Sequence, residues 1–556
     1  MRGEALLHRI RENVIGRDEA VLTPFGARRV TYADYTASGR ALAFIEDFLR
    51  TNVLPLYANT HTESSGTGLQ TTRFREDARA LIRECVKATD DHAVIFTGSG
   101  STGAIDKVVR ALGLRIPEQL EDRYRLSDQI PAVERPVVFI GPYEHHSNDL
   151  PWRESIADVV QIHEDLDGGI DVEELATALA AHADRPLLIG SFSAASNVTG
   201  ITSDVTAVTD VLHRHGALAL WDYAAAAPYV DIDVRRDDLD AVFISPHKFV
   251  GGPGTPGVLV ARRSLLSSRV PTVPGGGTVS YVNPEEQRYL GDVEQREEGG
   301  TPDIIGAIRA GLVFAVKRAV GDSVIRERET SFIRRAIGRW SANPAIEVLG
   351  DHDHERLSIV SFVVREPGGR YLHHNFVVAL LNDLFGIQSR GGCSCAGPYG
   401  HRLLGIDLEA SHAFEREITR GCEGIKPGWV RVNFNYFISE PTFAFILDAV
   451  DLIAERGWAL LSLYRFDEST GLWHHRDGVP APPMRLHDVT FDDEGRLVFD
   501  SRRQREERSR FGDYLAQARA IMDSAGDDIP CETPTFGADF EALRWFLLPG
   551  EAPARR

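Results

Sequence analysis

Lys248 lies in a stretch of sequence that suits a lysine nucleophile. Residues 241–244 form an apolar run with the length and β-branched content of a buried strand. The run stops at Ser245-Pro246, and His247 and Lys248 follow at once. Residues 251–257 then contain four glycines and two prolines, which exclude regular secondary structure. A lone lysine is usually just solvated, but one held at a strand end by a stiff turn is well placed to form a Schiff base.

An aspartate and a glycine-rich turn upstream indicate what such a lysine could bind. The segment Thr97-Gly-Ser-Gly-Ser-Thr-Gly103 opens a helix, so backbone N–H groups around Ser101 and Thr102 could hold a phosphate. This turn alone is a weak signal, because it has neither a Walker lysine nor a dinucleotide fingerprint. Asp222 alone would be read as a helix N-cap. With Lys248 downstream, it is the expected partner of a pyridinium nitrogen, whose ring acts as an electron sink.

A second reactive cluster lies in Gln388-Ser-Arg-Gly-Gly-Cys-Ser-Cys-Ala-Gly-Pro398. Two cysteines in a glycine-rich loop could be inert, metal-binding or nucleophilic. A zinc site made from Cys393, Cys395, His401 and Cys422 would lack a standard Cys-x-x-Cys pair. The nearby Arg390 favours the thiolate, which is the reactive form of cysteine.

Seven apolar runs, with amphipathic helices between several of them, provide the elements that must position these residues. They are residues 94–96, 137–140, 159–162, 187–189, 218–221, 241–244 and 258–260. Such runs alternating with helices predict a mainly parallel sheet that is covered on both faces. Ligands bind at the carboxyl ends of strands in such sheets, and five of these runs end in polar residues that could serve a site.

The overall composition is that of a soluble globular protein. Of 556 residues, 43% are apolar and 26% are charged, and the net charge of −20 argues against nucleic acid or anionic membrane as partners. No apolar run reaches the roughly 18 residues that a membrane helix needs. Charges interrupt the N-terminus too often for a signal peptide, and five cysteines are too few for a disulfide framework. We expect a cytoplasmic enzyme.

Together these motifs resemble the class V aminotransferase family of pyridoxal-phosphate enzymes, of fold type I, and within it the cysteine desulfurase and selenocysteine lyase branch. The resemblance covers residues from about 30 to 455. It implies an α/β fold, with a mainly parallel seven-stranded sheet in a large domain and a smaller α+β C-terminal domain. It also implies pyridoxal 5'-phosphate as the cofactor and an amino acid as the substrate.

The resemblance assigns roles to individual residues. Lys248 would carry the cofactor as a Schiff base, Asp222 would pair with its ring nitrogen, and His145 would stack on the ring. Asn197 would face the ring hydroxyl. The phosphate would be held by Ser101, Thr102, Ser245 and His247. Thr301, in Gly299-Gly-Thr-Pro302, would reach the phosphate of a neighbouring subunit, which implies a homodimer.

The cysteine loop resembles the Arg-x-Gly-x-x-Cys-Ala loop that carries the sulfur-accepting nucleophile, which here is Cys395. Arg431 matches the arginine that clamps the substrate carboxylate as a bidentate fork, and Arg390 would assist in substrate binding. Cys393 occupies a position that is not usually cysteine, so it could relay sulfur or resolve a persulfide. We therefore expect a cysteine desulfurase that leaves an enzyme persulfide, forms alanine and serves a sulfur-acceptor protein.

One departure and several alternatives stay open. Ala225 stands where desulfurases usually have a glutamine that bonds the ring hydroxyl. Molybdenum-cofactor sulfurases resemble the chain in that feature, but the last ~100 residues leave no room for their sulfur-carrier domain. A selenocysteine lyase is an alternative, and an epimerase, β-lyase or aminotransferase would not need Cys395. A non-catalytic regulator would need a basic DNA-binding module, which this acidic chain lacks.

We predict four parts. Residues 1–30 should be helical and then irregular, and pack on the small domain. Residues 31–303 should form the large cofactor-binding domain, and residues 304–456 the small domain, beginning with a helix at 304–320. Residues 457–556 form an extension of unknown role, with a hairpin at 463–473 and a charged helix at 502–522. Two histidine-rich spots, Asp351-His-Asp-His-Glu355 and His474-His475, are read as non-functional, the first as a solvated loop.

Overall fold

The computed structural model describes residues 2–60, 62–478, 480–506, 510–525 and 536–551. The chain folds into two compact units. The first contains Met1–Ile15, Tyr35–Thr330 and Asp351–Leu357, and the second contains Gly16–Asp34, Ser331–Gly350 and Ser358–Arg556. The predicted boundaries at residues 30, 303 and 456 stay predictions.

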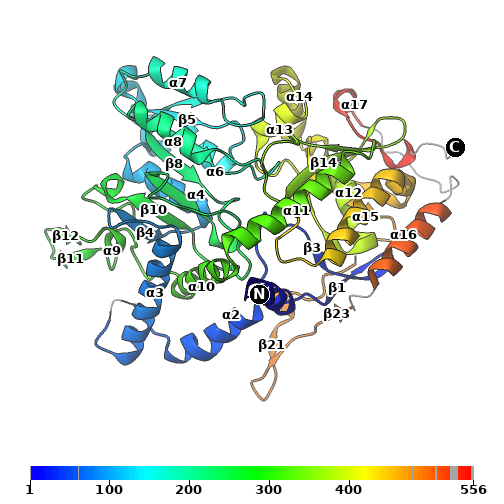
Figure 1. Cartoon of the computed structure of the whole chain (residues 1–556), viewed down its shortest axis with the longest axis horizontal. Coiled ribbons are helices and arrows are strands. Elements are labelled where there is room, and N and C mark those ends of the chain that lie inside the picture. The colour runs from blue at the N-terminus through cyan, green and yellow to red at the C-terminus, as the bar shows by residue number, and fades with distance from the viewer. Residues whose placement is uncertain (1, 61, 479, 507–509, 526–535, 552–556) are drawn as a thin grey trace. The chain divides into compact units, whose positions relative to one another are not determined.

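A seven-stranded sheet forms the centre of the first unit (Figure 1). Its strands are β4 (His92–Phe96), β5 (Val137–Ile140), β6 (Asp158–Gln161), β7 (Leu188–Ser193), β8 (Leu218–Asp222), β9 (Ala241–Ile244) and β10 (Val258–Arg262). They lie in the order β4-β10-β9-β8-β7-β5-β6. The strands from β5 to β9 are parallel to their neighbours, whereas β10 is antiparallel to β4 and β9. The sheet confirms the predicted mainly parallel arrangement, and each of the seven predicted strands is present.

Most of these strands are buried on both faces, as parallel strands covered by helices should be, whereas the edge strand β6 is half-buried. Every residue of β4, β5, β7 and β9 is buried. An apolar core lies between α4 (Gly100–Ala111) and the sheet, where Ile105 and Val109 join Phe243 and Leu259. Each such side chain contributes about 1.5–3 kcal/mol when fully buried. This packing fixes the start of α4 at the carboxyl end of the sheet.

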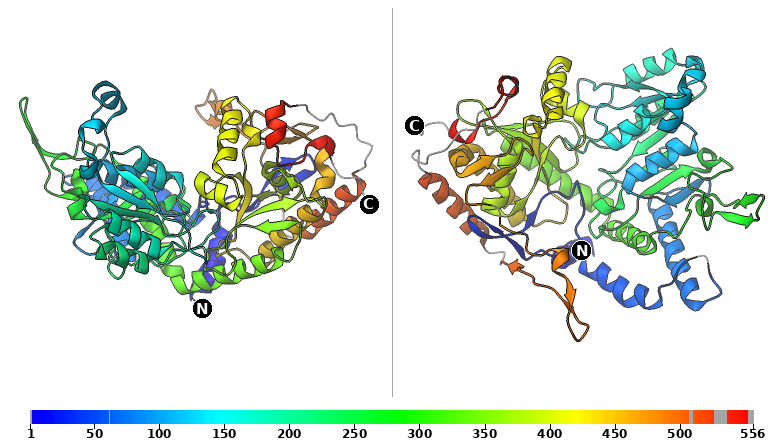
Figure 2. Two further views of the ribbon diagram at one scale, coloured as in Figure 1. Left: turned by 90° about the horizontal axis from the view of Figure 1, so that it is seen from above. Right: turned by 180° about the vertical axis from the view of Figure 1, so that it is seen from behind.

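Other helices of the first unit surround the sheet, and one hairpin projects from it. The helices are α1 (Arg2–Asn13), α2 (Ala43–Phe48), α3 (Gly66–Cys85), α5 (Glu118–Tyr124), α6 (His146–Arg153), α7 (Val172–Ala181), α8 (Val205–Arg214), α9 (Val293–Arg296) and α10 (Ile304–Val320). α11 (Asp322–Trp340) begins in the first unit and ends in the second. The hairpin of β11 (Val279–Val282) and β12 (Gln287–Tyr289) extends away from its unit in Figures 1 and 2.

The second unit is built on an antiparallel sheet of order β13-β14-β18-β17, with β15 also paired to β14. These strands are β13 (Ile346–Val348), β14 (Ile359–Arg365), β15 (Tyr371–Leu372), β17 (Arg390–Gly392) and β18 (Trp429–Asn433). A separate parallel pair joins β3 (Thr31–Tyr32) to β16 (Ile387–Gln388). The helices of this unit are α12 (His374–Phe385), α13 (Gly397–Leu403), α14 (Leu408–Thr419) and α15 (Glu440–Arg456).

The C-terminal extension belongs to the second unit. Its hairpin of β19 (Tyr464–Phe466) and β20 (Trp473–His475) confirms the predicted one. A further hairpin, β21 (Thr490–Phe491) with β22 (Leu497–Val498), projects from the unit in Figure 1 and in the right view of Figure 2. The helix α16 (Phe511–Ser524) begins later than predicted, because β23 (Gln504–Arg505) occupies the expected first turns. The last described helix is α17 (Ala538–Leu543).

A hairpin replaces the irregular segment predicted before residue 30. β1 (Glu19–Thr23) pairs with β2 (Gly26–Arg29), and β1 also pairs with β23 of the extension. Both strands are short and only partly buried, so neither shows a clear apolar alternation, and the second partner of β1 lies almost five hundred residues away. No helix within the described ranges combines the length and apolar character that crossing a bilayer requires. The cytoplasmic location stays a prediction.

Candidate active site

Backbone hydrogen bonds fix the lysine turn, residues 245–257, directly after β9. The Lys248 N–H donates to the Ser245 carbonyl at 3.0 Å, within a short 3-10 turn. Gly251 and Gly254 adopt φ values of 88° and 78°, so glycine occupies the left-handed positions. Lys248 is thus carried by an unstrained, closed turn at the strand end, as the sequence predicts.

Asp222 is the last residue of β8 and is 4% exposed. The Ala224 N–H donates to its Oδ1 at 2.8 Å. Burial raises the pKa of Asp222, and the Ala224 N–H, the Lys248 ammonium and the Ser101 hydroxyl oppose this shift. Lys248 and Ser101 are therefore near neighbours of the carboxylate. A buried carboxylate in this position could keep a ring nitrogen protonated.

The turn between β4 and α4 supplies donors that suit a phosphate. The Ser101 N–H donates to Ser245 Oγ at 2.9 Å. Gly100 has φ of +55°, and a Cβ there would come 2.8 Å from Ser245 Oγ and 2.9 Å from His247 Cε1. Burial and the Lys248 ammonium lower the pKa of His247 to about 4, so its imidazole is neutral at pH 7. Backbone N–H groups, hydroxyls and a neutral imidazole therefore converge here.

His145 is linked to this turn through Ser147. The His145 Nδ1 accepts the Ser147 N–H at 3.1 Å, which caps α6. Ser147 Oγ in turn lies 2.7 Å from Thr102 Oγ1. Because Nδ1 accepts a hydrogen bond, the neutral ring carries its proton on Nε2. The histidine predicted to stack on the cofactor and the predicted phosphate ligand Thr102 thus share one polar network.

Glu144 is a residue of this region that the sequence analysis did not name. Its oxygens accept the Ser193 N–H at 2.8 Å, the Ser193 hydroxyl at 2.6 Å and Asn148 Nδ2 at 2.6 Å. Burial raises the pKa of Glu144 to about 7; Ser193 and Asn148 oppose the shift, and the Asp222 charge adds to it. Glu144 ties the end of β7 to the start of α6. Its only sequence signal was its place directly before His145.

Asn197 lies in the loop that follows β7 and is 7% exposed. Ser196 Oγ accepts the N–H groups of Val198 and Thr199 at 3.1 Å each and so fixes this loop. Since β7 and β8 are neighbours, the loop begins beside the strand that ends at Asp222. Ala225, which stands in place of a glutamine, is also buried, at 7% exposure.

Thr301 lies on an exposed loop, where Asn59 Nδ2 donates to its Oγ1 at 3.4 Å. The buried Glu298 precedes this loop and accepts the Phe96 N–H at 2.6 Å and Arg79 Nη1 at 2.9 Å. Burial alone would raise the pKa of Glu298, but the Arg79 guanidinium outweighs it and keeps the pKa low. Glu298 therefore anchors the exposed loop to the end of β4, which leads into the turn before α4.

The cysteine turn, residues 393–396, connects β17 to α13 in the second unit. The Ala396 N–H donates to the Cys393 carbonyl at 3.1 Å. The two central residues, Ser394 and Cys395, have φ values of 51° and 57°. Two positive φ values are characteristic of a type I′ turn, and each costs about 1–2 kcal/mol in a residue other than glycine. Both cysteines are partly exposed, whereas Ser394 is 7% exposed.

Two arginines lie beside this turn. Arg390 on β17 pairs directly with Arg431 on β18. Arg431 is 3% exposed, and its Nη2 donates to Asp34 Oδ1 at 2.8 Å. Burial lowers the pKa of Arg431, and the positive charge of Arg390 lowers it further. The negative charges of Asp34 and Cys395 act in the opposite direction and raise it. The thiol and the guanidinium thus share one electrostatic environment. Asp34 was not predicted, because an aspartate in a short extended segment is a weak signal.

A histidine pair and the extension cover the back of β17. Trp545 stacks on His373 and His374, with ring centroids 5.4 Å and 5.8 Å away and interplanar angles of 20° and 12°. Burial lowers the pKa of His373, and it lowers that of His374 to about 3. A Cβ on Gly391 would come 3.1 Å from His374 Cδ2. The extension therefore supports the strand that leads into the cysteine turn.

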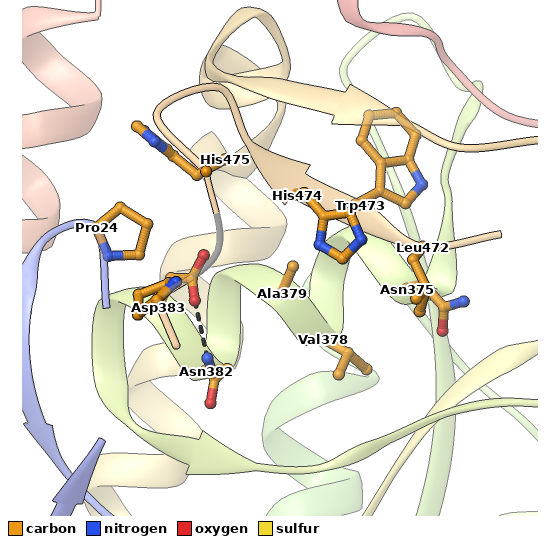
Figure 3. Close-up of a pocket in the computed structure, with 12 residues that line it drawn as sticks. Pro24, Asn375, Val378, Ala379, Asn382, Asp383, Leu472, Trp473, His474 and His475 are labelled. Carbon is orange, nitrogen blue, oxygen red and sulfur yellow. Dashed lines mark hydrogen bonds between the residues drawn. The ribbon is translucent and has the colours of Figure 1, made fainter. Parts of the chain in front are cut away.

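A separate cavity of about 260 Å³ lies between α12 and the hairpin β19–β20 (Figure 3). Asp383 lines it, accepting from Asn382 Nδ2 and from the Tyr464 hydroxyl at 2.8 Å each. Burial raises the pKa of Asp383. His474 and His475 also line the cavity. Across the part of the chain that the structure describes, no three His, Cys, Asp or Glu side chains gather as a metal ion would require.

Comparison with known families shows which family the chain belongs to. The family model described as aminotransferase class-V matches residues 31–409. The chain belongs to the aminotransferase class-V family. Enzymes of this family depend on pyridoxal phosphate, so the chain is a pyridoxal-phosphate-dependent enzyme, as predicted.

Its relatives are named cysteine desulfurases. A probable cysteine desulfurase of Halalkalibacterium halodurans is 29% identical over 377 residues, which cover 66% of this chain and 84% of the relative. A cysteine desulfurase of Escherichia coli O127:H6 is 27% identical over 377 residues, which cover 66% of this chain and 85% of that protein.

Solved structures show the same fold. The apo cysteine desulfurase from Thermococcus onnurineus NA1 aligns with a TM-score of 0.62 at 22% identity, over 76% of this chain and 94% of that one. A cysteine desulfurase from Escherichia coli aligns with a TM-score of 0.59 at 22% identity, over 76% and 93% of the two chains. These likenesses confirm the predicted fold class, fold type I of the pyridoxal-phosphate enzymes.

Proposed function

We propose that the first unit holds pyridoxal 5'-phosphate at the carboxyl ends of its strands. The residues present fit this cofactor. Gly100 leaves no room for a side chain beside Ser245 and His247, so a backbone N–H cradle and side-chain donors approach each other closely. The buried carboxylate of Asp222 has the Lys248 ammonium as a neighbour. This combination suits an aromatic cation that bears a phosphate and a carbonyl group.

In this assignment, the phosphate is held by Ser101, Thr102, Ser245 and His247. Asp222 keeps the ring nitrogen protonated, His145 stacks on the ring, and Asn197 faces its hydroxyl. When bound, the cofactor supplies an electron sink that stabilises negative charge at the substrate α-carbon. Lys248 anchors the cofactor and moves the proton of the substrate α-carbon.

We propose further that the enzyme is a cysteine desulfurase acting on L-cysteine. The observation that carries this proposal is the cysteine turn, which holds a partly exposed Cys395 next to the buried guanidinium of Arg431. Arg431 would bind the substrate carboxylate, with Arg390 beside it, and the thiolate of Cys395 would attack the substrate sulfur. The names of the relatives support the same reaction.

The sulfur step balances without an added oxidant. The substrate carbon–sulfur bond breaks while a sulfur–sulfur bond forms at Cys395. The substrate carbon takes up a proton and leaves as alanine, and Cys395 keeps the extra sulfur as a persulfide. We propose that this sulfur passes to an acceptor protein in the cytoplasm.

The decisive experiment compares Cys395→Ser with the parent enzyme. We expect the variant to retain bound cofactor and its characteristic absorbance, and to lose alanine formation from L-cysteine by about 10²-fold or more, because the nucleophile is gone. Cys422→Ser, at a partly exposed cysteine elsewhere in the second unit, is the matched control and should behave as the parent. Full alanine formation by Cys395→Ser would refute the assignment. Activity lost on cysteine but kept on selenocysteine would indicate a selenocysteine lyase.

A homodimer is the assembly that we propose. Thr301 lies on an exposed loop whose Gly300 N–H donates to the Gly276 carbonyl at 2.8 Å. Large exposed apolar side chains occur on the two segments that flank this loop, namely Leu54, Leu56, Tyr57, Val270, Val273, Tyr281 and Val282. Such an exposed apolar set is typical of a subunit interface. Thr301→Ala should weaken cofactor retention without dissociating the dimer. A fully loaded, active monomer in sedimentation experiments would contradict this proposal.

A further inference from the structure

The cysteine turn contains a second thiol, Cys393, for which the proposed reaction has no use. We propose that Cys393 resolves the persulfide of Cys395, so that the enzyme releases hydrosulfide and closes a Cys393–Cys395 disulfide when no acceptor takes the sulfur. This inference rests on the proposed desulfurase function, since that reaction loads Cys395. It deepens the function by making the turn a self-resolving sulfur site.

The geometry of the turn keeps the two thiols together. Cys393 and Cys395 are the first and third residues of one hydrogen-bonded turn, closed by the Ala396 N–H to the Cys393 carbonyl at 3.1 Å. Two residues of chain span at most about 7 Å when extended, and a turn shortens this distance. Disulfides join Cα atoms about 4.4–6.8 Å apart, so the turn fits one without a change of fold.

Both ends of the turn are anchored, so it cannot open easily. On one side, β17 pairs with β18, with Gly392 opposite Trp429. On the other, α13 begins at Gly397, and the Gly400 N–H donates to the Ala396 carbonyl at 2.9 Å. The two thiols therefore cannot drift apart as cysteines on a loose loop would.

Both thiols of the turn are accessible, whereas the side chain between them is buried. Ser394, between them, is 7% exposed, whereas Cys393 and Cys395 are both partly exposed. The middle side chain thus faces the protein, and the two flanking thiols remain within reach of solvent. Hydrosulfide formed there could diffuse away, and a dithiol could reach a disulfide.

The chemistry is a thiol–disulfide exchange that balances within the enzyme. The Cys393 thiolate attacks Sγ of Cys395, and the bond from that Sγ to the terminal sulfur breaks. The terminal sulfur leaves as hydrosulfide with the electron pair and takes up the proton that the Cys393 thiol gave up. Two cysteine thiols are oxidised to a disulfide while the transferred sulfur is reduced to sulfide. The next cycle requires an external dithiol that reduces the disulfide.

Attack at this sulfur is favoured by its leaving group. An exchange runs faster when the departing thiolate is the weaker base, and hydrosulfide is a weaker base than the thiolate of cysteine. Attack on the terminal sulfur would instead move it to Cys393 and release the Cys395 thiolate. Loss of hydrosulfide to solvent also makes resolution hard to reverse, whereas sulfur exchange between neighbours is freely reversible.

The test is a single turnover of the holoenzyme freed of reductant. One equivalent of L-cysteine is added, and alanine, sulfide and the mass of the alkylated peptide that contains the turn are measured. We expect the parent to form alanine, release an equal amount of sulfide and yield a peptide two hydrogens lighter, and then to stall until a dithiol is added. Cys393→Ser should form the same alanine, release at least about tenfold less sulfide and keep one extra sulfur on Cys395. Cys422→Ser is the control and should match the parent.

Three outcomes would overturn the inference while leaving the desulfurase intact. In the first, the parent forms alanine yet keeps the extra sulfur on Cys395. In the second, the extra sulfur is found on Cys393, which is a relay. In the third, Cys393→Ser releases sulfide like the parent. If no alanine forms, the desulfurase proposal fails instead, and inorganic polysulfide is then used to place the extra sulfur on Cys395 directly. The parent should again form the disulfide and release sulfide. Cys393→Ser should do neither.

Discussion

The lysine turn of the first unit and the cysteine turn of the second hold their reactive groups in opposite ways. In the lysine turn, Gly251 and Gly254 take the left-handed positions, and Lys248 follows an ordinary strand end. In the cysteine turn, Ser394 and Cys395 take those positions themselves. The lysine that we propose as the cofactor anchor is thus held without strain, whereas the thiol is held at a conformational cost of about 1–2 kcal/mol per residue.

The two regions also differ in charge. The buried carboxylate of Asp222 is a neighbour of Lys248, and the buried Glu144 is a neighbour of Asp222; the pKa of each carboxyl is raised. Around Cys395, the neighbours are the guanidiniums of Arg390 and Arg431. Carboxylates suit the cationic ring that we propose for the first region, and guanidiniums suit the substrate carboxylate and the anionic sulfur that we propose for the second. The two proposed tasks, holding the cofactor and transferring sulfur, thus fall to regions that differ in both strain and charge.

The largest expected effect tests the close packing of the lysine turn. A Cβ on Gly252 would come 2.1 Å from the Pro246 carbonyl oxygen, which is backbone and cannot move aside. We expect Gly252→Ala to lower the free energy of unfolding by about 3 kcal/mol and to reduce cofactor retention. Urea unfolding and cofactor absorbance measure both. Gly276→Ala, with nothing within 4 Å of its Cβ, is the control. Equal unfolding midpoints for the two variants would show that the lysine turn tolerates a side chain at Gly252.

A pH profile tests the buried charge beside the lysine turn. Glu144 has a pKa of about 7 in the folded protein, against an ordinary value of 4.5. Between these values the folded state keeps a proton that the unfolded state releases. Stability should therefore fall as pH rises from 4.5 to 7, by about 3 kcal/mol in all.

The side chain that the variant Glu144→Gln carries at this position cannot ionise. The free energy of unfolding of this variant should therefore lack the part of the decrease between pH 4.5 and 7 that Glu144 causes. Urea unfolding at several pH values measures the difference between variant and parent. The exposed Glu440→Gln should keep the parent's profile. A parallel profile for Glu144→Gln and the parent would show that Glu144 is already ionised near pH 5.

Removing Trp545 tests whether the extension supports the cysteine turn. Trp545 stacks on His373 and His374 behind β17, and its Nε1 donates to the Ile425 carbonyl at 3.1 Å. We expect Trp545→Ala to cost about 2 kcal/mol and to speed alkylation of Cys395, because the turn loses its backing. Trp458→Ala removes another half-buried tryptophan, whose Nε1 donates to the Glu455 carbonyl, and should leave alkylation of Cys395 unchanged. An unchanged rate of Cys395 alkylation in Trp545→Ala would show that the extension does not support the cysteine turn.

The smallest effect measures the strain itself. Ser394→Gly removes a left-handed penalty of about 1 kcal/mol and adds a glycine entropy cost of about 0.5 kcal/mol, so it should stabilise the protein by about 0.5 kcal/mol. Ser267→Gly, at a φ of −78°, has no such strain to relieve and should be destabilising. Thermal unfolding of both variants gives the comparison. A destabilised Ser394→Gly would mean that the cysteine turn is not strained.

The sequence determined the framework of the first unit. Each of the seven strands was visible, because a strand buried on both faces is a continuous apolar run that needs no knowledge of its neighbours. The positions of Asp222 and Lys248 just after apolar runs placed both residues at strand ends. Glycines marked the lysine turn and the cysteine turn. Motifs that depend on nearby residues were therefore readable, and so was the family.

Only the tertiary structure decided what depends on distant partners. The hairpin β1–β2 gains a third strand, β23, from the extension. Glu144 gains its raised pKa from burial among strand ends, and Asp34 becomes important only when β18 brings Arg431 to it. The left-handed φ of Cys395 is equally invisible in the sequence, because no local preference favours it. Local propensity makes strands and turns predictable from the sequence, whereas burial and long-range pairing determine the charge states and the backbone strain of a site.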